Sequence, residues 1–320
     1  MAEEILRVSH LSKRFHQAGL APVQAVSDVS FSVNQGETFG IVGESGCGKS
    51  TIGRLILRLV EPSEGEIFFE GKNILKYNKK SLLEIRKKIQ IVFQDPFASL
   101  NPRMTIEDII AEPLVCCTSM NAESRRQRVM ELLKLVGLNF DYADRYPHEF
   151  SGGQRQRICI ARALALNPKL IICDEAVSAL DVSIQSQILN LLRELQRQMG
   201  LTYIFISHNL SVVKHISDRI AVMYLGRLVE LTAKNILFNN PLHPYTKALL
   251  SAIPIPNPEI NKQRIILQGD IPNPRKPPSG CTFHTRCFSK LPPEGVSICE
   301  KSVPEWNLVA PEHNIACHLY

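Results

Sequence analysis

The sequence predicts an α/β fold built on a mostly parallel sheet, and two observations carry that prediction. Short apolar runs with the length of buried strands occur at residues 39–42, 89–93, 170–173 and 203–206. Segments with the apolar spacing of helices lie between these runs, at residues 50–60, 122–136, 154–165 and 184–199. Strands that alternate with helices favour a parallel sheet covered by helices on both faces.

Two hairpins are predicted outside this alternation. Residues 5–15 and 23–33 are strand-like and are separated by a loop that contains Gly19 and Pro22, which predicts an antiparallel hairpin at the start of the chain. A second hairpin is predicted over residues 220–231, with its turn near Gly226. The first hairpin predicts a small antiparallel β subdomain beside the parallel core.

Two regions depart from the α/β pattern. Strand signals stop between about residues 95 and 150, where helical patterns dominate, so we expect a helical subdomain over about residues 95–158. After about Asn240 the composition shifts to a proline-rich connector, which leads into a small cysteine-containing module. We therefore predict two domains, residues 1–240 and residues 241–320.

The composition is that of a chain that buries a sizeable core. Of its 320 residues, 44% are hydrophobic and 21% are charged. The 37 basic and 31 acidic residues give a net charge of +6, and the densest basic clusters are short: Lys79–Lys80, Arg86–Lys88 and Arg125–Arg128. Nucleic-acid-binding proteins usually carry a longer basic stripe. We interpret these clusters as solvated helix faces and expect no nucleic-acid partner.

The sequence predicts a cytosolic chain. No run of about 18 residues is both apolar and free of charge, as a membrane-spanning helix requires. The amino-terminal sequence begins with acidic residues rather than the basic head of a signal peptide. Because cytosolic thiols are kept reduced, the nine cysteines do not indicate a secreted disulfide scaffold.

A glycine-rich segment follows the predicted strand at residues 39–42 and fits the phosphate-binding pattern G-x-x-x-x-G-K-[ST]. Its glycines let successive backbone N–H groups turn toward phosphate oxygens, and the helix that follows points its positive end at the same anion. Lys49 can reach the outer phosphates of a nucleotide, and the Ser50 hydroxyl can ligate Mg²⁺. The expected contacts are Gly43, Glu44, Ser45, Gly46, Cys47, Gly48, Lys49, Ser50 and Thr51.

Two acids and a histidine follow predicted strands of the same sheet. Asp174 and Glu175 end the apolar run at residues 170–173, where they can hold Mg²⁺ and polarise an attacking water. His208 follows the run at residues 203–206 and would lie at the same edge. The plainer alternatives are two solvated acids at a strand end and a structural hydrogen-bonding histidine.

A second glycine-containing helix start lies at residues 151–154, Ser-Gly-Gly-Gln. Ser151 is a favourable N-cap, and Gly152 and Gly153 expose backbone N–H groups where a helix begins, which makes an anion site. A simple capped loop is the alternative interpretation.

The motifs together resemble those of the ABC-type ATPases. Phe150–Gln154 is similar to the family's signature, with Phe in place of the more common Leu, and Gln94 matches the Q-loop. Phe15 matches the aromatic residue that stacks on adenine, although it could equally be a core residue. The D-loop match is Ser178, Ala179, Leu180 and Asp181. The resemblance covers about residues 5–235 and implies a RecA-like P-loop core.

The resemblance also implies how the site works. ATP bound by the phosphate loop of one subunit would be covered by the signature of another, so Ser151, Gly152, Gly153 and Gln154 would contact ATP held by the partner. Mg²⁺ would be bound through Ser50, Gln94 and Asp174. Lys49, Gln94, Glu175 and His208 would then form a complete catalytic set, so we expect an active ATPase.

Longer segments resemble one branch of the family, the ATP-binding subunits of oligopeptide and dipeptide importers, and the F-type subunit most of all. The matching segments are residues 92–102, 174–183, 243–250, 278–287 and 316–318. This resemblance implies a second ATP-binding subunit of the D type, two transmembrane permeases and an extracytoplasmic solute-binding protein. It also implies a peripheral position on the cytoplasmic face of the membrane.

Other functions stay open at this stage. Related importers carry nickel or metal-chelating opines, so the solute is not defined by this chain. A soluble ABC protein of translation or DNA repair is a less favoured alternative, because the sequence has neither a second nucleotide-binding domain nor a long coiled coil. A small-molecule kinase would not explain residues 151–154.

The four last cysteines, Cys281, Cys287, Cys299 and Cys317, are separated by 5, 11 and 17 residues. Four thiolates can hold a [4Fe–4S] cluster or Zn²⁺, but this spacing matches neither a ferredoxin nor a zinc ribbon. Related importer subunits often end in such a module, and some bind an iron–sulfur cluster there. Four reduced thiols in a docking module is the competing interpretation. We also expect Cys47 to be reactive, because a helix N-terminus favours the thiolate.

Overall fold

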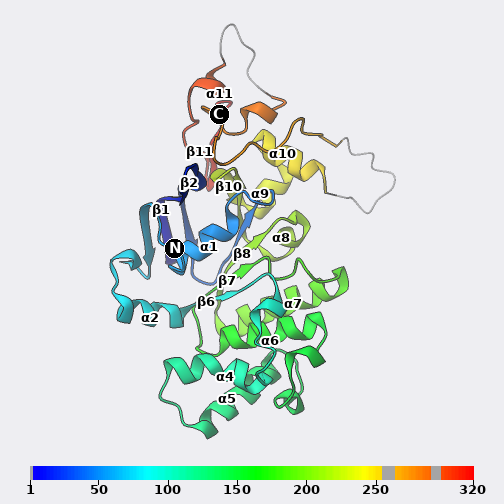
Figure 1. Cartoon of the computed structure of the whole chain (residues 1–320). Coiled ribbons are helices and arrows are strands. Elements are labelled where there is room, and N and C mark those ends of the chain that lie inside the picture. Colours follow the sequence, from blue (N-terminus) through cyan, green and yellow to red (C-terminus); the bar gives the residue numbers. More distant parts are fainter. Residues whose placement is uncertain (1–2, 254–263, 290–296) are drawn as a thin grey trace, which may run out of the picture. The chain divides into compact units, whose positions relative to one another are not determined.

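The computed structural model describes residues 3–253, 264–289 and 297–320, and the chain forms two compact units. The helical unit comprises Glu3, residues 34–37 and residues 76–206. The sheet unit comprises residues 4–33, 38–75 and 207–320. Figure 1 labels the elements of both units.

The helical unit contains three parallel strands in the order β8-β7-β6. They are β6 (Ile89–Val92), β7 (Leu170–Asp174) and β8 (Thr202–Ser207). Every residue of β7 and β8 is buried, as expected for strands covered on both faces. Both strands end in polar residues, so the sheet presents polar side chains at the carboxyl ends of its strands.

Helices make up the rest of this unit. They are α2 (Lys79–Lys88), α3 (Pro96–Ser99), α4 (Ile106–Cys117), α5 (Ala122–Leu135), η2 (Phe140–Tyr142), η3 (Pro147–Glu149), α6 (Gly152–Leu164) and α7 (Val182–Met199). Figure 1 shows α4 and α5 side by side, and both pack on α6. Asparagine, threonine, serine or aspartate side chains cap most of these helices, which is why they begin where they do.

The sheet unit begins with an antiparallel sheet in the order β2-β1-β4-β5. Its strands are β1 (Glu4–Gln17), β2 (Leu20–Asn34), β4 (Glu64–Phe69) and β5 (Lys72–Asn73). The first hairpin turns at Ala18 and Gly19, so the predicted loop is too long and Pro22 lies inside β2. Because β2 is the edge strand, Pro22 removes no internal ladder hydrogen bond.

A second set of strands runs in the order β11-β12-β10-β9-β3. They are β3 (Thr38–Val42), β9 (Arg219–Tyr224), β10 (Arg227–Ala233), β11 (Asn307–Ala310) and β12 (His313–Ile315). Strands β3 and β9 are parallel, whereas β9 and β10 form the predicted antiparallel hairpin with its turn at Leu225 and Gly226. Strand β12 pairs with β10, so the carboxyl terminus of the chain completes this sheet.

Short helices connect these strands. They are α1 (Lys49–Ile56), η1 (Ile74–Lys76), α8 (Leu210–Ile216), α9 (Lys234–Asn239), α10 (Pro244–Ser251), η4 (His284–Arg286) and α11 (Ile298–Lys301). Helix α1 is shorter than the segment predicted at residues 50–60. Among the helices of the described ranges, none has the length and apolar character needed to cross a bilayer.

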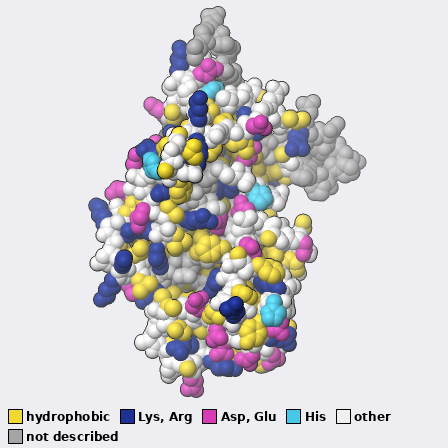
Figure 2. Space-filling model, viewed as in Figure 1, with side chains coloured by type: hydrophobic (Ala, Val, Ile, Leu, Met, Phe, Trp, Pro, Cys, Tyr) yellow, Lys and Arg dark blue, Asp and Glu magenta, His cyan; other side chains and the backbone are white. Residues whose placement is uncertain are grey.

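The α/β prediction is confirmed at the level of elements, because each predicted core strand and helix occurs within a few residues of its predicted bounds. The described elements between residues 95 and 150 are all helical, as predicted. The domain boundary near residue 240 stays a prediction. Figure 2 shows basic and acidic side chains mixed across the visible face, and Lys79 and Lys80 are exposed to solvent.

A buried carboxylate ties the carboxyl-terminal segments of the sheet unit together. Glu230 on β10 is fully buried and accepts hydrogen bonds from the backbone N–H groups of Leu242 and His243, at 2.8 and 3.0 Å. The Nε2 atom of His313 on β12 lies 2.8 Å from the same carboxylate. Because a buried carboxylate without partners is costly, this network fixes the entry to α10 and the position of β12.

His243 makes this region sensitive to acid. It is 1% exposed, its Nδ1 accepts the Tyr245 N–H at 3.1 Å, and burial lowers its pKa to about 3, with Lys247 adding to the effect. Between about pH 6.5 and 3 the unfolded chain therefore binds a proton that the folded chain does not bind. The free energy of unfolding should fall with decreasing pH in that window, by up to about 1.4 kcal/mol per pH unit.

We predict that His243→Asn, which keeps a capping acceptor but cannot titrate, loses less stability than the parent between pH 7 and 5. The expected difference is about 2 kcal/mol, measured by urea unfolding at both pH values. His16→Asn, at an exposed histidine of β1, is the control and should behave like the parent. Equal acid sensitivity in His243→Asn and the parent would refute the assignment.

Candidate functional site

The phosphate loop lies between β3 and α1 of the sheet unit, as predicted. Three of its glycines have positive φ values: Gly43 at 157°, Gly46 at 78° and Gly48 at 104°. A Cβ atom on Gly43 would lie 2.1 Å from the Met223 carbonyl oxygen, and one on Gly48 would lie 2.0 Å from the Ala25 carbonyl oxygen. The loop can therefore take this path only with glycine at positions 43 and 48.

Lys49 opens α1 and is held inside the loop. It is 4% exposed, and its Nζ donates to the carbonyl oxygens of Gly43 and Glu44 at 2.8 and 2.9 Å. A buried ammonium among loop carbonyls is a cation ready to exchange those acceptors for phosphate oxygens. Ser50 and Thr51 follow on the first turn of α1 and are half-buried.

The expectation of a reactive Cys47 is wrong. Its side chain is buried, and burial raises the pKa of the thiol, an effect that outweighs the opposing influence of Lys49. The helix-end argument fails here because removal of the thiol from water disfavours the thiolate more than the nearby positive charge favours it. Cys47 is a packing residue of the loop.

Two further predicted residues of the sheet unit are accessible. Phe15 on β1 is 40% exposed, so it is not a core residue, and the Lys13 Nζ lies 5.1 Å from the centre of its ring. His208 directly follows β8 and is exposed, while the neighbouring Ser207 hydroxyl accepts the Asn209 N–H. Both side chains are exposed to solvent.

In the helical unit, the two predicted acids stand where β7 ends. Asp174 is the last residue of β7 and is 4% exposed. Glu175 has a φ of 50°, which is unusual for a glutamate. Its N–H donates to the Ile206 carbonyl at 3.0 Å, and its carbonyl accepts both the N–H and the hydroxyl of Ser178. Strained backbone held by several hydrogen bonds is typical of functional sites.

The predicted D-loop leads directly into α7. Asp181 caps that helix, accepting the Ile184 N–H at 2.9 Å and the Ser183 hydroxyl at 2.6 Å. The Ser183 hydrogen bond is the main reason that the pKa of Asp181 is lowered. The Gln185 amide donates to the carbonyls of Val177 and Leu180, which fixes the loop from the other side.

The signature segment begins α6 with a reciprocal capping box. The Ser151 hydroxyl accepts the Gln154 N–H at 3.4 Å, and the Gln154 side chain accepts the Ser151 N–H at 3.0 Å. A Cβ atom on Gly153 would lie 2.6 Å from Ile184 of α7, so this glycine lets α6 and α7 approach closely. The helix start thus has its own cap and a rigid support.

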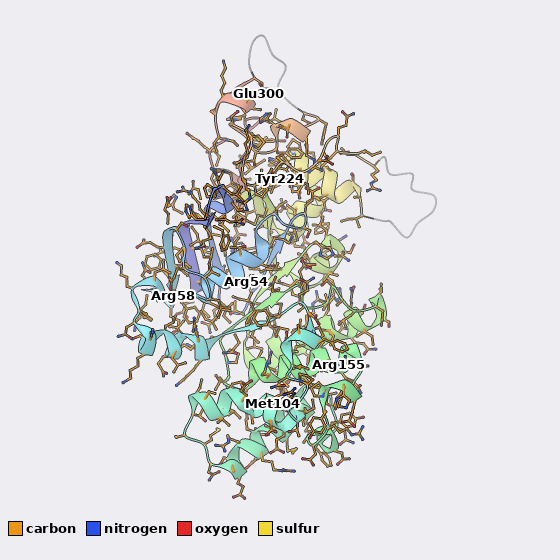
Figure 3. All side chains as sticks on the ribbon, viewed as in Figure 1. Arg54, Arg58, Met104, Arg155, Tyr224 and Glu300 are labelled. Atoms are coloured by element: carbon orange, nitrogen blue, oxygen red, sulfur yellow. The ribbon has the colours of Figure 1, made fainter. Side chains whose placement is uncertain are left out.

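A groove lies beside α3, α4 and α6. Gln94 is exposed at the bend between β6 and α3. The groove has a volume of about 530 Å³. It is lined by residues 97–102, Met104, Ile109, Glu112 and Arg162. The Arg155 guanidinium lies 3.5 Å from the centre of the Phe97 ring at this end of the unit, where Figure 3 labels Arg155 and Met104.

Sequence reasoning missed two partners of the phosphate loop. The Glu44 N–H donates to the Tyr245 hydroxyl at 2.9 Å, and the Glu44 carboxylate pairs with Arg286 at 2.8 and 3.2 Å. Both partners belong to the predicted carboxyl-terminal extension. They lie 201 and 242 residues along the chain from Glu44, and no local pattern could have signalled them.

The four carboxyl-terminal cysteines do not support the metal-cluster interpretation. Burial raises the pKa of the Cys281 thiol to about 11, and the other three thiols raise it further. Within residues 3–253, 264–289 and 297–320, no group of three or more His, Cys, Asp or Glu side chains is placed to hold a metal ion.

Comparison with known proteins places this site in a family. A family model described as "ABC transporter" matches residues 26–178, and one described as "Oligopeptide/dipeptide transporter, C-terminal region" matches residues 229–293. The oligopeptide transport ATP-binding protein AppF of Bacillus subtilis is 54% identical over 99% of this chain and 98% of its own length. The dipeptide transport ATP-binding protein DppF of Haemophilus influenzae is 49% identical over 92% of this chain and 89% of its own length.

Solved structures agree with these relatives. The dimeric ATP-binding cassette MJ0796 bound to ADP and Pi is 31% identical, covers 72% of this chain and 99% of its own, and has a TM-score of 0.66. The cbiO1 protein of Clostridium perfringens, part of the ABC transporter complex cbiONQ, is 30% identical over 74% of this chain and 92% of its own, with a TM-score of 0.67.

These matches define an ABC-type ATPase with a RecA-like core. The chain belongs to the family of oligopeptide and dipeptide transport ATP-binding proteins, which it matches over almost its whole length. The family binds ATP, and membership confirms the resemblance on which the sequence interpretation depends.

We predict that Gly48→Ala reduces MgATP affinity at least tenfold, because its Cβ would collide with the Ala25 carbonyl and displace Lys49. Isothermal titration calorimetry of the whole chain measures the effect. Gly71→Ala, in the turn between β4 and β5, is the matched control: its φ is also positive, at 72°, but no described atom lies within 4 Å of the added Cβ. It should lose only about 1–2 kcal/mol of stability. Equal affinity losses in the two variants would contradict the collision argument.

Proposed function

We propose that this chain is the ATP-hydrolysing subunit of an importer that takes up oligopeptides or dipeptides through partner permeases. One observation carries the proposal: the chain has two glycine-containing helix starts, one with a buried lysine and one with a side-chain cap. The first encloses the buried ammonium of Lys49, and the second, at Ser151, is capped and supported from α7. A single triphosphate does not require both, whereas an ATP shared between two subunits does.

In the proposed cycle, the phosphate loop binds the triphosphate and Phe15 stacks on the adenine. Lys49 transfers its hydrogen bonds from loop carbonyls to phosphate oxygens. The N–H groups of Ser151, Gly152 and Gly153, with Gln154 beside them, contact the γ-phosphate of ATP held by the neighbouring subunit. ATP then joins the two subunits, and its hydrolysis releases them.

The hydrolytic step is assigned to three residues. Glu175 acts as the general base toward the attacking water, a role that its strained, hydrogen-bonded backbone supports. Gln94 orients the water, and His208 donates to the γ-phosphate. The D-loop, residues 178–181, connects Glu175 to α7, and α7 packs against the start of α6 at Gly153. Through this connection the D-loop signals to one ATP site whether ATP has been hydrolysed at the other.

The donor chemistry of the predicted ligands fits Mg²⁺, with Ser50 in the sheet unit and Gln94 and Asp174 in the helical unit. The hydroxyl of Ser50, the amide oxygen of Gln94 and the carboxylate of Asp174 are the oxygen ligands that this ion prefers, and Asp174 is almost fully buried. Bound Mg²⁺ would neutralise charge on the phosphate oxygens during hydrolysis.

The transport partners follow from the same proposal. The groove lined by residues 97–102 and Glu112 receives a short helix of a permease, since its lining begins three residues after Gln94 in the chain. A movement of Gln94 on nucleotide binding would therefore reach the groove. The remaining components are a non-identical D-type ATP-binding subunit, two permeases and a solute-binding protein. This chain sits peripherally on the cytoplasmic face of the membrane.

We predict that Glu175→Gln lowers ATP turnover of the assembled transporter at least about 100-fold and traps bound ATP, because the amide cannot accept a proton from water. Phosphate release and the amount of retained nucleotide are measured together. Glu194→Gln, on an exposed face of α7, is the matched control and should keep full turnover. Unchanged turnover in Glu175→Gln would remove Glu175 from its role.

A second prediction concerns coupling. Ala98→Arg adds bulk and charge inside the groove, so it should reduce peptide uptake at least tenfold while the chain still binds MgATP with its normal affinity. Uptake of a labelled peptide into vesicles containing the whole transporter is the measurement. Ala122→Arg, at the exposed start of α5 outside the groove, is the control. Normal uptake with Ala98→Arg would refute the docking assignment.

A further inference from the structure

Glu44 of the phosphate loop is held at four of its atoms by three residues, and two of these three residues come from the carboxyl-terminal extension. Its N–H donates to the hydroxyl of Tyr245 on α10 at 2.9 Å. Its carboxylate oxygens accept from the two terminal nitrogens of Arg286 at 2.8 and 3.2 Å. Its carbonyl oxygen accepts from Lys49 at 2.9 Å. The extension is therefore connected to the catalytic lysine through a single residue.

The Arg286–Glu44 pair is shielded from water. The side chain of Arg286 is 8% exposed and that of Glu44 is 26% exposed. Tyr224, Tyr245 and Phe283 form a packed aromatic cluster beside the pair, with ring centres 4.7–5.4 Å apart. Figure 3 labels Tyr224, whose hydroxyl lies 3.5 Å from Arg286. In such surroundings a bidentate pair is strong, and loss of one partner leaves an uncompensated charge.

Arg286 is itself fixed by the backbone around two of the cysteines. It ends the turn η4, which begins where the His284 N–H donates to the Cys281 carbonyl at 3.0 Å. The Cys281 N–H in turn donates to the Cys299 carbonyl at 2.8 Å. Gly280 permits this approach, because a Cβ there would lie 2.5 Å from the Cys299 oxygen. The backbone of the cysteine-containing module thus fixes the position of Arg286.

The position of Arg286 matters because of the charge on Glu44. Glu44 places a carboxylate in a loop that must bind a polyanion, and an unpaired carboxylate there would repel phosphate. Arg286 neutralises that carboxylate with a charge supplied from outside the loop. At the same time Arg286 and Tyr245 hold both ends of Glu44, whose carbonyl helps to set the position of Lys49.

We propose that Arg286 is a positioning residue for ATP binding, and that the carboxyl-terminal extension serves the nucleotide site by neutralising Glu44 and fixing the first turn of the phosphate loop. The inference rests on nucleotide binding at this loop, which is part of the proposed function. It adds a role for the extension inside the subunit itself, independent of any permease or second subunit.

The test is a double-mutant cycle on the full-length chain, with MgATP affinity measured by isothermal titration calorimetry. Arg286→Met removes the charge and leaves Glu44 unpaired, so the dissociation constant should rise about tenfold or more. Adding Glu44→Gln to that variant removes the repelling carboxylate and should restore most of the affinity. If Arg286 only stabilised the fold, adding Glu44→Gln would not restore the MgATP affinity.

Two further variants keep the result interpretable. Tyr245→Phe removes the acceptor of the Glu44 N–H without changing charge, and should weaken MgATP binding by a smaller factor, about threefold. Arg264→Met removes an exposed arginine from the same extension and should bind MgATP like the parent. If Arg286→Met does not fold, Arg286→Gln, which also removes the charge but keeps a hydrogen-bond donor, takes its place in the cycle with the same expected rescue by Glu44→Gln.

The outcomes separate the two proposals. If the parent chain binds MgATP but Arg286→Met binds it equally well, or the double variant binds no better than Arg286→Met, the role of Arg286 is refuted and the proposed function stands. If the parent itself does not bind MgATP, the proposed function fails first.

Discussion

The nucleotide site depends on backbone segments that approach each other more closely than any side chain would permit. Gly43 and Gly48 pass within about van der Waals contact of neighbouring carbonyls, and Gly153 does the same against α7. These approaches let rows of N–H groups point outward at two helix starts. A triphosphate is a dense negative charge, and oriented N–H groups with one buried ammonium can bind it without rearranging.

The carboxyl-terminal extension belongs to this arrangement rather than standing apart from it. Glu44 is an acidic residue of the phosphate loop, and its carboxylate forms an ion pair with Arg286 of the extension. The rigidity of the extension has its own sources, namely the buried Glu230 network and the aromatic cluster around Tyr245. Packing far along the chain therefore sets the geometry where chemistry occurs.

Local patterns in the sequence are enough to predict much of the fold and of the candidate site. Short-range rules of glycine, capping and strand length predict the phosphate loop, the Ser151 N-cap and the core strands, because the decisive interactions are only a few residues apart. The same rules fail where distant contacts decide. Burial raises the pKa of the Cys47 thiol, Pro22 is tolerated because β2 is an edge strand, and the partners of Glu44 lie more than 200 residues away.

We propose that two subunits hold one ATP from opposite sides. The most direct measurement is a structure of the assembled transporter, carrying Glu175→Gln and saturated with MgATP. The account predicts that the N–H groups of residues 151–153 lie within hydrogen-bonding distance of a γ-phosphate whose other oxygens are bound by the phosphate loop of the neighbouring subunit. Residues 151–153 remote from every bound γ-phosphate would contradict it.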